Sequence, residues 1–248
     1  MLPEIISGGA RGQTQRRACP LTAVSGLAKL RSIESEIMNF READTVPASL
    51  LVELDSIMER LALAQLFPKP QPLEVELGCG DASFLAEYAR RNPDQNFIGV
   101  ERLLGRIQKL DRKGRRAGLA NLRGVRIESS YFLKYLLPPH AATALHIYFP
   151  DPWPKKKHRR HRLINENFPA LARAALAPDG VVYLRTDDTD YFAQMTEVFG
   201  VSKEFSKVET PAELAEVLTD FERDFNARDI PTLRAAYQLK GRMNNGET

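Results

Sequence analysis

Apolar and polar residues follow two different spacings along most of the chain. Short apolar runs and alternating stretches, typical of buried or half-buried strands, predict strands over residues 73–77, 96–100, 122–127, 144–149, 181–185, 201–208 and 232–239. Between them, apolar residues recur at the helical period, which predicts helices over 82–91, 103–118, 163–176 and 190–199 and a short helical turn over 131–137. Strands and helices that alternate in this way predict an α/β fold, a mostly parallel, doubly wound sheet with helices on both faces.

Four segments of the chain differ in pattern. Residues 1–44 contain few apolar residues at any period, so we expect a disordered or weakly ordered N-terminal extension, with a transit peptide as the less favoured alternative. Residues 45–72 contain leucines at the helical period and then the stretch Pro68–Pro72, which predicts a helix over 47–67 and a linker. Residues 73–240 carry the alternating strands and helices and form the predicted main domain, and residues 241–248 form a C-terminal tail.

Composition narrows the class of protein. The 248 residues are 43% hydrophobic and 27% charged, which is typical of a soluble globular protein, and no apolar run approaches the ~20 residues that span a bilayer. The first 20 residues lack the charged and apolar regions of a secretion signal, and two cysteines provide neither a disulfide framework nor a metal site. We therefore expect a cytoplasmic protein. Because the net charge is only +3, any anion-binding surface must be local.

The most unusual stretch is Phe-Pro-Asp-Pro-Trp-Pro at residues 149–154, followed by six lysines and arginines within residues 155–162. Asp151 lies between two prolines at the end of a predicted strand, where open α/β sheets bind their ligands. Residues before proline are biased to extended backbone, so Phe149, Asp151 and Trp153 are expected on a stiff, extended segment. Taken alone, the basic run is either a solvated surface loop or a phosphate-binding surface beside a functional acid.

A glycine turn follows the first strand of the main domain. Gly78 and Gly80 precede a helix, and Glu101 ends the second strand 21 residues after Gly80, which is the arrangement of a nucleoside site whose acid binds a ribose. The dinucleotide fingerprint requires glycine where Ser83 stands. Glu76 and the acid just after the turn would repel a pyrophosphate and suit a cationic cofactor, which describes S-adenosylmethionine.

Five motifs together resemble the bacterial tRNA (guanine-N7-)-methyltransferase family, and the resemblance covers residues 73–239. They are Glu-Leu-Gly-Cys-Gly at 76–80, Gly-Val-Glu at 99–101, Phe-Pro-Asp-Pro-Trp-Pro-Lys-Lys at 149–156, Thr-Asp at 186–187 and Thr-Asp-Phe-Glu at 219–222. The resemblance implies a Rossmann-like class I methyltransferase fold in the domain at 73–240. It also implies transfer of a methyl group from S-adenosyl-L-methionine to N7 of a guanine in tRNA.

The resemblance also implies roles for individual residues. Asp151 is the expected active-site residue, and no metal is expected. The expected cofactor contacts are Glu76, Gly78, Gly80, Glu101, Ser129 and Asp151. The expected contacts to the target guanosine are Lys155, Asp187, Thr219, Asp220, Phe221 and Glu222. Beside these motifs, the basic run 155–162 is interpreted as a phosphate-binding surface.

Three positions depart from the family's pattern. Ala82 stands where a third glycine is usual. The third strand ends in Glu128-Ser129-Ser130 in place of Asp or Asn followed by Ala, so either Ser129 or Glu128 makes the adenine-side contact. A glycine expected after residues 219–222 is replaced near Asp229, which leaves the register of the last strand open.

The chemistry needs little proton transfer, because guanine N7 carries a lone pair and no hydrogen. Positioning two reactants in line contributes roughly 7 to 11 kcal/mol in favourable cases, and the Asp151 carboxylate is suited to stabilise the positive charge that develops on guanine. Trp153 either stacks on a base or packs in the core, with the core slightly favoured.

The alternatives to methylation of guanine N7 in tRNA are methylation of another RNA or of an exocyclic amine, and an RNA-binding protein with a degenerate cofactor pocket. The expected partner is tRNA, with no membrane and no obligatory protein partner; the oligomeric state stays open.

Overall fold

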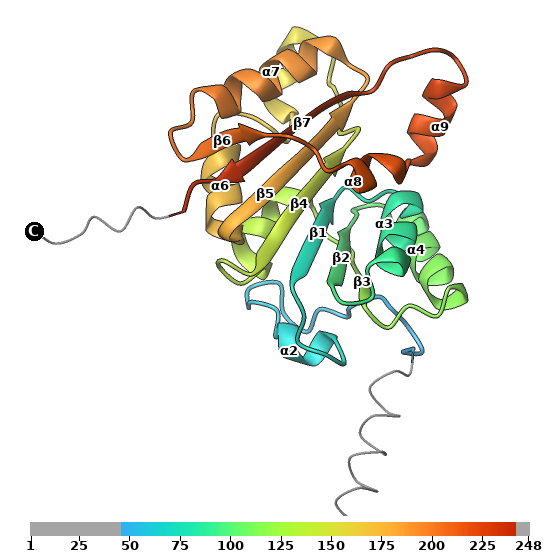
Figure 1. Cartoon of the computed structure of the whole chain (residues 1–248). Helices are drawn as coiled ribbons and strands as arrows, with labels where there is room; N and C mark the ends of the chain where they lie inside the picture. Colours follow the sequence, from blue (N-terminus) through green and yellow to red (C-terminus); the bar gives the residue numbers. More distant parts are fainter. Residues whose placement is uncertain (1–45, 242–248) are drawn as a thin grey trace, which may run out of the picture. The chain divides into compact units, whose positions relative to one another are not determined.

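Seven strands form one sheet in the order β3-β2-β1-β4-β5-β7-β6 in the computed structural model of the chain (Figure 1). The strands are β1 Leu73–Leu77, β2 Asn96–Val100, β3 Leu122–Val125, β4 Ala142–Tyr148, β5 Leu176–Thr186, β6 Phe205–Val208 and β7 Leu233–Leu239. The pairs among β1 to β5 are parallel, whereas β7 runs antiparallel to both β5 and β6. The prediction of a mostly parallel α/β sheet is confirmed.

The structure describes residues 46–241, all of which belong to one compact unit. The expectations for residues 1–44 and for all but the first residue of the tail at 241–248 fall outside these residues. Within 46–241, none of the helices is both long and apolar enough to cross a membrane.

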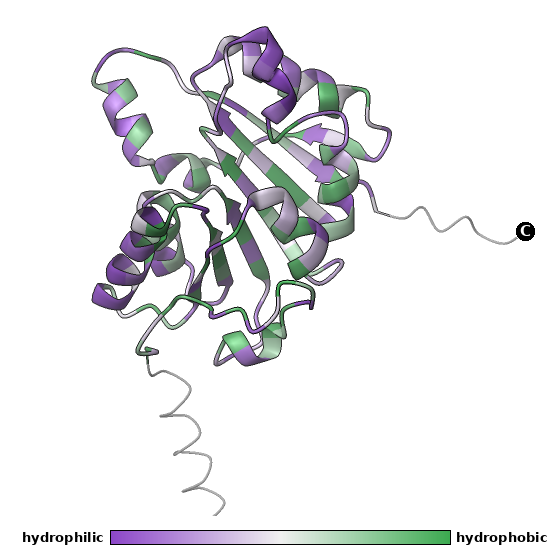
Figure 2. Ribbon diagram, turned by 180° about the vertical axis from the view of Figure 1, so that it is seen from behind, coloured by the Kyte–Doolittle hydropathy of each residue, from purple (hydrophilic) through white to green (hydrophobic). Residues whose placement is uncertain are grey.

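Helices cover both faces of the sheet. On one face, α3 (Ser83–Arg91) and α4 (Leu104–Arg116) pack around residues such as Phe84 and Ile107. On the other, α6 (Phe168–Ala175) and α7 (Thr189–Gly200) bury apolar side chains against the strands. Figure 2 shows apolar residues along the strands and polar residues on the outer sides of the helices. The remaining short elements are α2 Leu63–Leu66, α5 Ser129–Tyr131, a π-helical turn Phe132–Leu136, a 3₁₀ segment Lys156–His161, α8 Ala212–Glu216 and α9 Asp220–Asn226.

The helix predicted over residues 47–67 is wrong, because only α2 forms there. The backbone at Leu50 to Val52 instead pairs with the sheet edge: Val52 N–H donates to Gly124 O at 2.8 Å, and Gly124 N–H donates to Leu50 O at 2.9 Å. Edge strand β3 offers unpaired backbone groups that a neighbouring segment can satisfy. Leucines at the helical spacing are also compatible with this backbone pairing, so the contact with β3 decides the conformation of the segment.

The later elements follow the predictions with local differences. Strand β5 begins at Leu176, five residues earlier than predicted, because the Pro178–Gly180 turn forms an irregularity within the strand. Helices α8 and α9 were not predicted. The register left open for the last strand is set by Val182 opposite Tyr237. Asp229 has φ 56°, the left-handed conformation that favours glycine and that Asp tolerates better than most residues.

Candidate functional site

A cleft opens at the carboxyl ends of β1, β2 and β4. The strand order reverses here, since β2 lies on one side of β1 and β4 on the other, and open α/β sheets bind ligands at such a switch point. One part of the cleft, the Glu101 compartment, has a volume of about 400 Å³. The adjoining Glu76 compartment has a volume of about 300 Å³.

The two compartments share several residues and differ in the rest. Both are lined by Gly78, Arg106, Phe149 and Asp151. The Glu101 compartment is further defined by Leu77, Glu101, Arg102, Ile127, Glu128 and Ser129. The Glu76 compartment is further defined by Glu76, Cys79, Asp81, Thr219, Asp220 and Phe221.

The turn after β1 forms the floor between the compartments. Gly78 and Gly80 have φ values of 76° and 55°, and a Cβ at either position would meet no atom within 4 Å. The backbone conformation, and not lack of space, therefore requires glycine at both positions. Ala82 follows with φ 58° although it carries a Cβ, so this alanine occupies a conformation that favours the glycine usual in the family.

Glu101 is anchored to this turn. Its side chain accepts a hydrogen bond from Gly80 N–H at 3.2 Å and another from Leu103 N–H at 2.7 Å, and the residue is buried. Each carboxylate oxygen retains further acceptor capacity. The strand end, the turn and the acid are thus held in one rigid arrangement that faces the Glu101 compartment.

Glu76 lies on β1 with little exposure, and its Oε2 atom has no hydrogen-bond partner within residues 46–241. Burial raises the pKa of Glu76 well above its ordinary value, and the nearby Arg185 guanidinium offsets this only in part. A buried carboxylate oxygen without a partner is costly unless a donor or a cation reaches it. Because Glu76 lines the compartment, a cationic ligand group there would satisfy it.

Replacement of Glu76 by Gln is expected to stabilise the ligand-free protein at neutral pH. Because the folded pKa is raised, the folded state binds more protons than the unfolded state above the ordinary carboxyl range. The free energy of unfolding of the parent therefore falls as pH rises from the unfolded pKa of Glu76 to its raised folded pKa. The free energy of unfolding of the variant should not fall in this interval. Urea unfolding at several pH values measures the difference. A variant less stable than the parent at every pH would show that Glu76 already has a partner.

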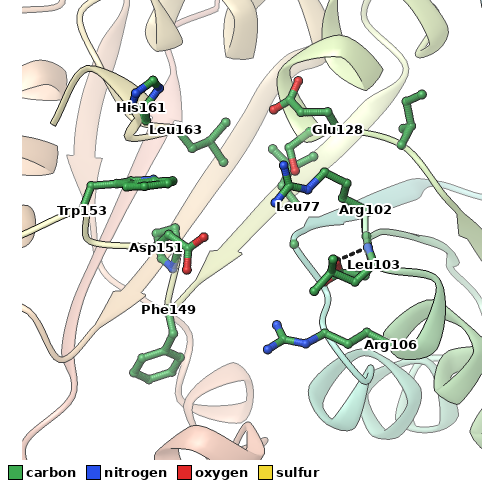
Figure 3. A pocket seen from close by; sticks show the side chains of 15 residues that line it. Leu77, Arg102, Leu103, Arg106, Glu128, Phe149, Asp151, Trp153, His161 and Leu163 are labelled. Carbon is green, nitrogen blue, oxygen red and sulfur yellow. Dashed lines mark hydrogen bonds between the residues drawn. The ribbon is translucent and has the colours of Figure 1, made fainter. Parts of the chain in front are cut away.

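Asp151 projects into the cleft from the loop after β4, opposite Arg102 and Arg106 (Figure 3). The prediction that Phe149 and Trp153 are extended is wrong, since their φ values are 51° and 44°. Tertiary contacts impose this conformation, at a cost of about 1 to 3 kcal/mol for each such residue. Phe149 N–H donates to Arg185 O at 2.8 Å, so the β4–β5 pairing continues one residue beyond the strand.

The loop that carries Asp151 is tied down by Arg162. This side chain is 1% exposed, and it donates to Pro152 O and to the Asp190 carboxylate, each at 2.6 Å, and to Gln194 Oε1 at 2.7 Å. The interpretation of the whole run 155–162 as a phosphate-binding surface is therefore wrong for Arg162, which faces inward. Exposed cations of the run are Lys155, Lys156, Lys157 and Arg160.

Trp153 is not a core residue, so the packing role that the sequence slightly favoured is wrong. It is 37% exposed, lines the Glu101 compartment, and lies 5.2 Å from His161 between ring centroids. Phe221 is 50% exposed in the Glu76 compartment. Aromatic faces therefore flank Asp151 in both compartments.

Five of the six predicted guanosine contacts fall into two groups. Thr219, Asp220 and Phe221 line the Glu76 compartment. Lys155 and Asp187 are exposed and line neither compartment.

Glu222, the remaining predicted guanosine contact, is fully buried and does not reach the cleft. Its carboxylate accepts hydrogen bonds from Arg185 at 2.8 Å, from Arg234 at 2.9 Å and from Thr219 N–H at 2.9 Å. It forms a capping box with Thr219 at the start of α9. Glu222 therefore holds the loop that carries Thr219 and Phe221.

Glu128 and Ser129 both line the Glu101 compartment. The Glu128 carboxylate accepts from Ser130 N–H at 2.9 Å and from Tyr131 N–H at 2.7 Å, so it caps the short helix α5. Each oxygen thus accepts one backbone hydrogen bond and, like the oxygens of Glu101, retains further acceptor capacity, so both alternatives for an adenine-side contact stay open.

Sequence reasoning missed the cations of the cleft. Arg102, just before α4, and Arg106, in its first turn, point into the cleft (Figure 3). Lys109 lines the Glu76 compartment. A basic helix sequence was the available signal, since α4 contains six lysines and arginines and one acid. Arg185 was also missed, although an arginine in an apolar strand usually has a buried partner. Within the described part of the chain, no three side chains of His, Cys, Asp or Glu are placed to hold a metal ion.

Comparison with known proteins identifies the family. A family model described as "Putative methyltransferase" matches residues 70–235. The chain belongs to this methyltransferase family. The resemblance inferred from the five motifs is thereby confirmed at the level of the family.

Individual relatives agree with this assignment. The tRNA (guanine-N(7)-)-methyltransferase of Chromohalobacter salexigens is 40% identical over 139 residues, which cover 56% of each chain. The protein of the same name from Thermotoga maritima is 32% identical over 169 residues, 68% of this chain and 50% of the relative. The chain thus spans about half the length of these curated relatives.

A solved structure confirms the fold. The 16S rRNA methyltransferase KamB superposes with a TM-score of 0.53 at 15% identity, over 73% of this chain and 95% of that chain. At this identity the likeness concerns the fold alone. Together with the sheet order, it confirms the Rossmann-like methyltransferase fold predicted for this family member.

Proposed function

We propose that this chain transfers a methyl group from S-adenosyl-L-methionine to N7 of a guanine in tRNA. The observation that carries the proposal is the meeting of two compartments at Asp151, one bordered by Glu101 and the other by Glu76, whose Oε2 atom has no hydrogen-bond partner within residues 46–241. Named tRNA (guanine-N(7)-)-methyltransferases among the relatives support the reaction class.

The cofactor fits the residues present. Glu101, held at the glycine turn, is suited to accept hydrogen bonds from ribose hydroxyls. Glu76 is suited to pair with the cationic amino acid end of the cofactor, because its buried Oε2 atom lacks a partner in the described part of the chain. When bound, S-adenosylmethionine supplies an electrophilic methyl group on a sulfonium centre. Gly78, Gly80 and Ser129 complete the proposed set of cofactor contacts.

The target base is proposed to enter from the open side of the cleft. The guanine base is stacked within folded tRNA, so it must be splayed out before its N7 atom can react. Trp153 and Phe221 offer partly exposed aromatic faces on which a displaced base can stack. Asp151 then lies beside the ring that becomes cationic, where a fixed carboxylate stabilises the developing charge. Thr219 and Asp220, and on the outer surface Lys155 and Asp187, form the proposed tRNA contacts.

Nucleoside analysis of a methylation reaction tests the proposal. An unmodified tRNA transcript incubated with the protein and methyl-labelled S-adenosylmethionine is expected to yield labelled 7-methylguanosine. The matched control is a transcript made with 7-deazaguanosine, which has carbon in place of N7 and should accept no label.

Three other results would contradict the proposal. Label in the 7-deaza transcript would indicate methylation of an exocyclic amine or another base. Label only in a different RNA would indicate another substrate, and tRNA binding without any label would indicate an RNA-binding protein.

A further inference from the structure

Helix α4 carries a dense positive surface that the proposed reaction does not use. Its sequence contains Arg106, Lys109, Arg112, Lys113, Arg115 and Arg116 against one acid, Asp111. The whole chain has a net charge of only +3, so this helix is a local concentration of charge. Its apolar side is buried at Ile107 and Leu110, which leaves the cations toward solvent.

The cations form a continuous row along the helix. Arg106, Lys109, Lys113 and Arg116 are spaced by three or four residues, so they lie on one side of α4. Arg106 and Lys109 line the cleft, which places the beginning of the row at the candidate active site. At 1.5 Å per residue the row extends about 15 Å from Arg106 to Arg116.

The far end of the row is a hollow lined by three arginines. Arg112, Arg115 and Arg116 surround a volume of about 510 Å³ together with residues 46–48. Of these, Arg115 lies 3.6 Å from Asp111, and neither Arg112 nor Arg116 makes an ion pair within residues 46–241. Within residues 46–241, Asp111 is the only carboxylate that pairs with these three guanidinium groups, so the hollow is suited to an anion with several oxygens, such as a phosphate.

We propose that α4 binds the sugar–phosphate backbone of the RNA substrate, with the Arg112–Arg116 hollow as its distal phosphate site. The proposal rests on the proposed function, since it assumes that the substrate is tRNA. Lys113 connects the row to the cleft wall, because its Nζ donates to Asp81 at 2.9 Å and lies 3.9 Å from the Asp220 carboxylate. RNA held along α4 is thereby aligned with the compartments on either side of Asp151.

The test is the triple variant Arg112→Gln, Arg115→Gln and Arg116→Gln in the full chain. Glutamine has a helix propensity close to that of arginine, so α4 should remain folded. Binding of unmodified tRNA is measured by fluorescence anisotropy over a range of salt concentrations. We expect affinity at low salt to fall on the order of tenfold or more, and the slope of log Kd against log salt to fall by about 2. The single-turnover rate at saturating tRNA and the affinity for S-adenosylmethionine should not change.

A second triple variant is the matched control. Arg173→Gln, Lys203→Gln and Lys207→Gln remove the same charge from exposed positions at the opposite edge of the sheet from β3. Lys207 lies on β6, Lys203 lies just before it, and Arg173 on α6 pairs at 2.8 Å with Glu204, the residue before β6. This control should leave the salt dependence of tRNA binding close to that of the parent.

The outcomes separate the two proposals. Equal effects of the two triple variants, or an α4 variant that binds tRNA like the parent, would overturn the role of α4. If the hollow accommodates an acidic segment of the chain itself, the α4 variant would lose thermal stability and keep its tRNA affinity, which also overturns it. A parent protein that binds no tRNA or methylates no guanine N7 would instead refute the proposed function.

Discussion

Replacement of Asp151 by Asn is expected to lower the single-turnover rate of methyl transfer by about 100- to 1000-fold, the usual effect of removing a fixed group that stabilises developing charge. Asparagine keeps the shape of the side chain and removes its charge. The loop should retain its conformation, because Arg162 and the β4–β5 pairing hold the backbone on either side of residue 151. Binding of tRNA should change little.

The measurement needs saturating cofactor, because the same carboxylate faces both compartments and its loss can weaken cofactor binding. Asp94→Asn is the matched control, since Asp94 is an exposed acid in the turn between α3 and β2. That control should react at the parental rate. If Asp151→Asn also reacts at the parental rate, Asp151 takes no part in the chemistry.

Replacement of Glu222 by Gln is expected to destabilise the fold by about 3 to 5 kcal/mol, because it leaves the guanidinium of Arg185 buried without its carboxylate partner. The two side chains are 1% and 0% exposed and are 2.8 Å apart. Arg185 also stacks over Tyr148 at 4.2 Å and donates to Val217 O at 2.8 Å, so it cannot turn toward solvent without disrupting neighbouring contacts. Urea unfolding at neutral pH gives the change in free energy.

Two comparisons strengthen this measurement. Glu216→Gln makes the same chemical change at a side chain that is 72% exposed, and it should alter stability by about 0.5 kcal/mol or less. In the double variant Glu222→Gln, Arg185→Met, the loss in free energy of unfolding should be smaller than the sum of the losses in the two single variants, because both charges are removed together. Strict additivity would show that the pair does not act as a unit.

The parts of the site that were predicted from sequence are those set by local geometry. Glycine at positive φ and a strand that ends before the turn depend on residues near one another in the chain, and the acid at the end of the next strand follows from the regular spacing of successive strands. Gly80 and Glu101, for example, were paired from their spacing, and the structure joins them by a hydrogen bond of 3.2 Å. The prolines likewise predicted where the loop of Asp151 lies. They did not predict that Phe149 and Trp153 have positive φ.

The parts that failed are those in which a charged residue has a partner far along the chain. Arg162 belongs to a basic run, and the sequence alone places all such residues in solvent; its partners on α7 turn it inward. Glu222 matches a family motif, yet Arg185 and Arg234 enclose it. The free-energy cost of burying a charge depends on these partners, and the pattern of a single segment carries no record of them.

The sequence by itself therefore determined the order of the strands and of the helices other than α8 and α9, the glycine turn with its two acids, and the position of Asp151 at a strand end. Periodicity, chirality and the proline ring act within a few residues, so a local stretch is sufficient to specify them. Only the tertiary structure decided which charges line the cleft, which support it from within, and that the segment around Leu51 pairs with the sheet edge. Those outcomes depend on hydrogen bonds and burial between segments that are distant in sequence and meet only in the folded protein.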